Sequence, residues 1–185
     1  QGRYEAKKEL GLPIYYIVDP DADLEDCRRM NEYNSHWTND DFINSFADEG
    51  NPSYIELRKL KNEVKQPILR ILRLANKGSK TGHNGEKELV KAGRLRFAEN
   101  DSHIVKNVLE KANEIAEALC MTKRLNDAFY VAVKIACEFE GYDHERMLRN
   151  CKSQRSSYNQ MSNLENQLKE FSRIYNHGAK RSKHL

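Results

Sequence analysis

Residues 104–119 read IVKNVLEKANEIAEAL, and an apolar side chain recurs there at every third or fourth position. This interval is the period of an amphipathic α-helix with one buried face. Two later stretches repeat the pattern, so we predict a mainly α fold with a carboxyl-terminal helical bundle over 102–177. The predicted buried positions are Ile104, Val108, Ala112, Ile115 and Leu119, then Leu125, Ala128 or Phe129, Ala132, Ile135 or Ala136 and Phe139, then Met161, Leu164, Leu168, Phe171 and Tyr175.

Helix-start signals precede the bundle and divide residues 38–98 into shorter helices. Thr38 with Asp41 three residues later predicts a capping box and a helix over 39–48. Asn51-Pro52 and Gln66-Pro67 place a proline at the start of each of the next two helices. The predicted helices of this middle region, together with a short one in the bundle, are 39–48, 52–64, 67–76, 86–97 and 143–151. A polar, glycine-rich loop is expected over 77–85.

The amino-terminal 35 residues have a different pattern. Ile14–Val18 (IYYIV) is β-branched and aromatic, which predicts a strand buried within a sheet. A helix over 24–33 should follow, with Asp23 as its cap. One strand cannot form a sheet and the chain opens with Gln1 rather than Met. We therefore interpret 1–35 as a small α/β remnant whose upstream part has been removed.

The composition indicates which classes of protein the chain can belong to. Charged residues make up 32% of the 185 residues, and no apolar run approaches the roughly 18 residues of a membrane span. The chain is long enough to fold without disulfides, and most of its cysteines lie beside apolar residues in predicted helices. We expect reduced thiols and a cytoplasmic protein. The cysteines are Cys27, Cys120, Cys137 and Cys151.

The small net charge of +3 hides a strong division along the chain. Residues 1–57 hold five basic against thirteen acidic residues, whereas residues 58–96 hold twelve basic against three acidic ones. A basic region of short helices is typical of proteins that neutralise nucleic-acid phosphates. The alternative is a solvated basic face that pairs with the acidic first third. The candidate phosphate contacts are Arg58, Lys61, Arg70, Arg73, Lys77, Lys80, Lys91 and Arg94.

No catalytic, metal or cofactor site is predicted from the motifs. Asp19-x-Asp21-x-Asp23 resembles the start of a calcium loop, but Leu24 and Met30 occupy the positions of its glycine and glutamate. Gly78–Gly82 lacks the spacing and the preceding strand of a phosphate loop. The histidines show no zinc spacing.

The amino end resembles the ParB family of partition proteins, which carries a Gly-Glu-Arg-Arg-Tyr-x-Ala box followed by a helix, a glycine and a strand. Residues 1–6 (QGRYEA) and 10–14 (LGLPI) carry this resemblance. Further similarity is to looser ParB-like proteins of phages and mobile elements. It includes Asn34, Trp37-Thr38, Asp41-Phe42-Ile43, Gly50, Tyr54, Leu57, Leu60 and Ile174-Tyr175-Asn176.

The resemblance implies a nucleotide- or phosphate-handling α/β domain followed by a helix-turn-helix DNA-binding domain. Arg3 matches the last arginine of the box, which contacts nucleotide phosphates in the family. Gly2 stands where the family has the preceding arginine, so we expect no nucleotide turnover. The helix-turn-helix is expected within 53–98, although its turn does not match the usual short spacing.

These observations predict a DNA-binding protein of ParB-like type, acting in partition or mobile-element regulation through its basic helices. A helical interaction module or inhibitor, whose carboxyl-terminal helices bind a partner or form a homodimer, is the second hypothesis. The third is a metal-dependent nuclease using the acidic turn 19–26. The basic tail 178–185 could also reach a phosphate backbone.

Overall fold

The computed structural model describes residues 21, 23–26, 37–75, 83–122 and 124–178. The chain divides into two compact units, Gln1–Trp37 and Thr38–Leu185. In the first unit Leu24–Asp26 are helical, and the predicted strand 14–18 lies outside the described residues. The backbone N–H of Asp26 donates to Asp23 Oδ1 at 2.9 Å and that of Asp23 to Asp26 Oδ2 at 3.3 Å. These acidic side chains therefore cap a helix.

In the second unit, helices α3 (Asn39–Asp48) and α4 (Pro52–Val64) have the predicted bounds. The predicted capping box is confirmed, because Asp41 accepts a hydrogen bond from the Thr38 backbone at 2.8 Å and Thr38 Oγ1 accepts from Asp41 N. Asn51 caps α4 through Ser53 N at 3.1 Å. The two helices pack together, and they bury Phe42, Ile43, Phe46, Tyr54, Leu57 and Leu60.

Helix α5 (Ile68–Leu74) matches its prediction closely, but α6 (His83–Lys91) begins inside the predicted loop and ends six residues before the predicted helix end at 97. Gly93, with a φ of +67°, ends the helical path. This left-handed conformation favours glycine. Residues 94–97 then run without helix, and exposed Arg94 and Arg96 alternate with buried Leu95 and Phe97.

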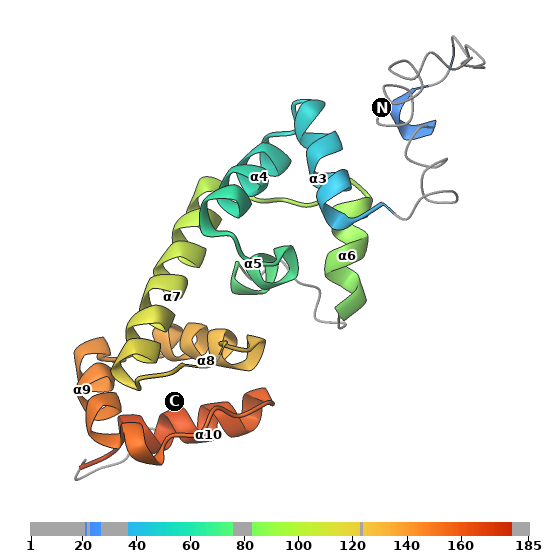
Figure 1. The fold of residues 1–185 in the computed structure, drawn as a ribbon. Coiled ribbons are helices and arrows are strands. Elements are labelled where there is room, and N and C mark those ends of the chain that lie inside the picture. The colour runs from blue at the N-terminus through green and yellow to red at the C-terminus, as the bar shows by residue number, and fades with distance from the viewer. Residues whose placement is uncertain (1–20, 22, 27–36, 76–82, 123, 179–185) are drawn as a thin grey trace, which may run out of the picture. The chain divides into compact units, whose positions relative to one another are not determined.

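Helix α7 (Glu99–Ala118) is the longest described element and contacts α4, α5, α8 and α9. In Figure 1 it runs from beside α4 to the region of α8 and α9. The prediction was wrong at one position, because Ile104 is exposed and Val105 is buried in its place. A helix covered on several sides buries a wider stripe than one spaced series of residues. Its buried residues include Val105, Val108, Leu109, Ala112 and Ile115.

Helices α8 (Asp127–Glu138) and α9 (His144–Gln154) pack against α7, and α10 (Leu164–Tyr175) packs against α8 and α9. The 3₁₀ turn η1 (Arg155–Ser157) follows α9. Phe129 of α8 meets Phe171 of α10 edge to face, with ring centroids 5.3 Å apart. The buried Asn150 amide donates to the carbonyl oxygens of Ile174 and Tyr175, both at 3.0 Å. This contact satisfies carbonyls at the end of α10 that lack a partner within the helix.

Across the described residues the fold is mainly helical, as predicted, and none of these helices combines the length and apolarity needed to cross a membrane. Cys120, Cys137 and Cys151 are free thiols. The predicted regions 38–98 and 102–177 belong to one compact unit.

Candidate nucleic-acid interface

Two predicted phosphate contacts on α4 form ion pairs with the acidic helix α3. Arg58 Nη1 lies 2.6 Å from Asp48 Oδ1, and Lys61 Nζ lies 2.5 Å from Asp40 Oδ2. Both pairs are partly exposed to solvent. Exposed pairs contribute only about 0–1 kcal/mol, so an arriving phosphate can exchange with the carboxylate at small cost.

Arg70 and Arg73 of α5 meet at a single carboxylate, that of Asp127 at the start of α8. Arg70 Nη2 lies 2.6 Å from Asp127 Oδ1, and Arg73 Nη1 lies 2.8 Å from Asp127 Oδ2. The Arg70 guanidinium also lies 4.4 Å from the Tyr130 ring centroid, and only 9% of the residue is exposed. The predicted shared face is therefore present, but it points into the interface between α5 and α8. We assign these two arginines a structural role joining those helices.

Lys91 and Arg94 lie at and beyond the end of α6. The Lys91 ammonium is 5.9 Å from the Phe42 ring centroid, whereas Arg94 is exposed. Arg96, two residues later, is exposed on the same extended segment. Neither Arg94 nor Arg96 forms an ion pair with any residue that the structure describes. Lys65 and Lys87 are likewise exposed cations without such a pair, while Lys59 lies 3.9 Å from Glu56.

Other predicted contacts lie outside the described residues. These are Lys77, Lys80 and Arg3. The acidic turn proposed for a nuclease is described only at residues 21 and 23–26, where Asp23 and Asp26 serve as caps. Over the described ranges no three histidine, cysteine or acidic side chains gather as a metal site would require.

Three-residue connections join α3 to α4 and α4 to α5. The first contains Gly50 with a φ of +87°, and the second begins with Lys65 at a φ of +51°. None of the seven residues of α5 is exposed, so this helix has no free face for a nucleic-acid groove. Helix α4 is different, because Ile55 is 43% exposed and Lys59 and Asn62 are exposed beside it.

The carboxyl-terminal seam predicted to bind a partner is largely used inside the bundle. Phe171 and Tyr175 are fully buried, and Met161, Leu164 and Leu168 are half-buried. The homodimer stays a prediction.

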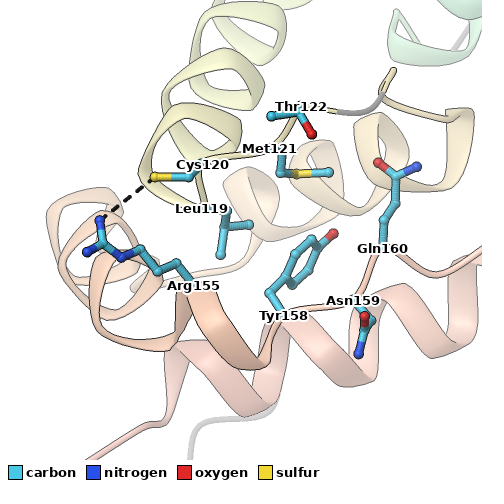
Figure 2. A pocket seen from close by; sticks show the side chains of 8 residues that line it. All are labelled: Leu119, Cys120, Met121, Thr122, Arg155, Tyr158, Asn159 and Gln160. Carbon is cyan, nitrogen blue, oxygen red and sulfur yellow. Dashed lines mark hydrogen bonds between the residues drawn. The ribbon is translucent and has the colours of Figure 1, made fainter.

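A polar hollow that the sequence did not predict lies between the end of α7 and the segment after α9. It has a volume of about 330 Å³ and is lined by Leu119, Cys120, Met121, Thr122, Arg155, Tyr158, Asn159 and Gln160. Figure 2 shows Arg155 directed at Cys120, with Nη1 3.8 Å from Sγ. A second hollow, of about 390 Å³, shares these two residues and is also lined by Glu114, Glu117 and Lys152. Because both hollows are open and the second one mixes acidic and basic groups, we assign them no ligand.

The exposed Cys120 should react with iodoacetamide before the other described thiols. Burial raises the pKa of Cys151 to about 12 and also raises the pKa of Cys137, so both thiols should form thiolate less readily than an ordinary cysteine. With Cys27 changed to serine, mass spectrometry of peptides after brief alkylation should find the label at Cys120. Equal labelling of Cys151 in the folded protein would contradict this burial.

Comparisons with known proteins add no assignment. No family model matches the sequence, and no curated protein or solved structure is significantly similar to the chain.

Proposed function

We propose that this chain binds nucleic acid by its phosphate backbone, through cations of the helical unit between α4 and the start of α7. The observation that carries the proposal is the pair Arg94 and Arg96, which is exposed and lacks a carboxylate partner among the described residues. Buried Leu95 and Phe97 anchor the same segment, so both guanidinium groups project from a fixed backbone. These two exposed guanidinium groups can neutralise phosphates.

Arg58 and Lys61 of α4 are further candidate phosphate contacts. Their partners Asp48 and Asp40 are half or more exposed, so phosphates can compete with them. The exposed cations Lys65 and Lys87 flank the same part of the chain. Arg70 and Arg73 are left out because Asp127 holds both.

We also propose α3, the turn at Gly50 and α4 as a helix-turn-helix, with α4 as the helix presented to the duplex. A three-residue connection containing a glycine is typical of this motif. Residues near the start of the second helix contact base edges in such proteins. Ile55 occupies an exposed position there, and Lys59 is exposed one turn further along α4. A role in partition or mobile-element regulation remains the proposal implied by the ParB resemblance.

Changing Arg94 and Arg96 to glutamine should weaken binding to a fluorescently labelled 24-bp duplex. The slope of log affinity against log salt is negative, and each lost phosphate contact makes it less negative by about 1. The double variant should therefore have a slope less negative by about 2. Affinity at 50 mM KCl should fall by about tenfold or more. Fluorescence anisotropy at 50 and 200 mM KCl measures both quantities.

The matched control changes Lys106 and Lys169 to glutamine. It removes the same charge, but these lysines already pair at 2.6 Å with Glu63 and Glu165. The control should bind nearly as well as the unchanged protein. An equal loss in both double variants would show that only total charge matters and would overturn the assignment to Arg94 and Arg96.

A further inference from the structure

Helix α9 and the first residue of η1 together present a row of exposed cations. Arg149, Lys152 and Arg155 follow one another at intervals of three residues and are all exposed, while Met147 and Cys151 face the core. Side chains three apart lie on neighbouring positions of one helix face. This row, hereafter the α9 row, is a surface of the folded bundle.

No cation of the α9 row forms an ion pair with a described residue. Lys106, Lys134, Lys169 and Arg173 all lie within 3 Å of a carboxylate oxygen. Among the described residues, the polar contact of the α9 row is that of Arg155 with the Cys120 thiol. Glu145 is the exposed acid on the same helix, and Glu114 and Glu117 line the hollow beside Lys152 and Arg155. With Arg146 of α9 the cations here are four against these three acids, and Glu114 also pairs with His144, so a small excess of positive charge remains.

The chain beyond α10 starts beside this surface. Asn150 of α9 binds the carbonyls of Ile174 and Tyr175, and Gln154 Nε2 lies 3.1 Å from His177 Nε2. The sequence then continues with Lys180-Arg181-Ser182-Lys183-His184. The last described residues after α10 therefore lie beside Gln154 of α9.

We propose that the α9 row is a second phosphate-contacting surface for nucleic acid, an inference that rests on the proposed function. A polyanion fits the excess positive charge. An anionic membrane surface fits less well, because membrane-bound amphipathic helices expose large apolar side chains beside their cations. Over the described residues the exposed large hydrophobic side chains are Leu24, Ile55 and Ile104, and none lies on α9.

The two cationic surfaces lie near opposite ends of α7. Arg94 and Arg96 precede its first residue, Glu99, and Arg155 contacts Cys120 just after its last residue. A helix of 20 residues is about 30 Å long. One turn of duplex, about 34 Å, covers a similar length. A duplex that reaches both surfaces must therefore be about a turn or longer, and a 24-bp probe satisfies this condition.

The test changes Arg149, Lys152 and Arg155 together to glutamine and repeats the duplex titration. We expect the slope of log affinity against log salt to become less negative by about 3, as for three lost phosphate contacts. Binding to vesicles of phosphatidylserine and phosphatidylcholine should be absent in the unchanged protein. Far-UV circular dichroism must show an unchanged fold. If the triple variant unfolds, the double variant R149Q/K152Q, which keeps the contact with Cys120, is used instead. Its slope should be less negative by about 2.

The outcomes separate this proposal from the proposed function. If R94Q/R96Q loses duplex affinity but the α9 variants bind as the unchanged protein does, the α9 proposal is overturned and the proposed function stands. If the unchanged protein binds no duplex, both are overturned. Vesicle binding that the α9 variants abolish, with duplex binding intact, would assign the row to membranes and contradict the inference.

Discussion

Replacing Gly93 with alanine is expected to lower the free energy of unfolding by about 2–4 kcal/mol, from positive-φ strain and overpacking together. The backbone φ there is +67°, and a Cβ would lie 2.6 Å from Cε1 and 2.8 Å from Cζ of the Phe46 ring. Phe46 cannot withdraw easily, because its ring packs 4.8 Å from that of Tyr54, which is fully buried. Urea unfolding followed by circular dichroism measures the loss.

Gly50 provides the matched control. Its φ is +87°, but nothing lies within 4 Å of an added Cβ. Alanine at this position should cost only the backbone strain of about 1–2 kcal/mol. Equal losses at Gly50 and Gly93 would mean that the contact between the 92–94 turn and Phe46 is not formed.

Changing Asn150 to aspartate should destabilise the bundle by about 3 kcal/mol or more, because a buried charge would replace a donor. The Asn150 amide donates to two carbonyl oxygens at 3.0 Å, and a carboxylate would face the same oxygens without a proton. Such a carboxylate has a raised pKa in the folded state, so the variant should regain stability as the pH falls. Thermal unfolding at pH 7.5 and pH 5 measures both effects.

An equivalent change at Asn113 separates charge from burial. Asn113 is exposed on α7, so N113D adds the same charge to solvent and should change stability by less than about 0.5 kcal/mol. If N150D unfolds with the same midpoint as N113D, Asn150 does not hold the end of α10.

Local signals in the sequence predicted much of this fold. The Thr38 and Asn51 caps act between neighbouring residues, and α3 and α4 were predicted at the observed bounds for that reason. The end of α6 was predicted too late, because the helix ends before Gly93, and Leu95 and Phe97 then alternate with Arg94 and Arg96 as in extended backbone. Only the position of Phe46, distant in sequence, reveals why glycine is required at 93. The same limit explains Ile104, whose exposure depends on which helices cover α7.

The candidate site was harder to predict because charge neutralisation is a long-range property. The sequence gives the basic excess of residues 58–96, but not which of these cations have acidic partners. Arg70 and Asp127 are 57 residues apart, and Lys61 and Asp40 are 21 apart. Arg94 and Arg96 could have been ranked higher from their alternation with Leu95 and Phe97, a pattern of an anchored extended segment.

The most direct measurement is a titration of the unchanged chain with a labelled 24-bp duplex between 50 and 300 mM KCl. Binding through several phosphates predicts a dissociation constant of about 1–100 μM or tighter. It also predicts log affinity that falls linearly with log salt, with a slope of about −2 or steeper. No detectable binding at 50 mM KCl, or affinity that does not change with salt, would contradict a phosphate-binding role for this protein.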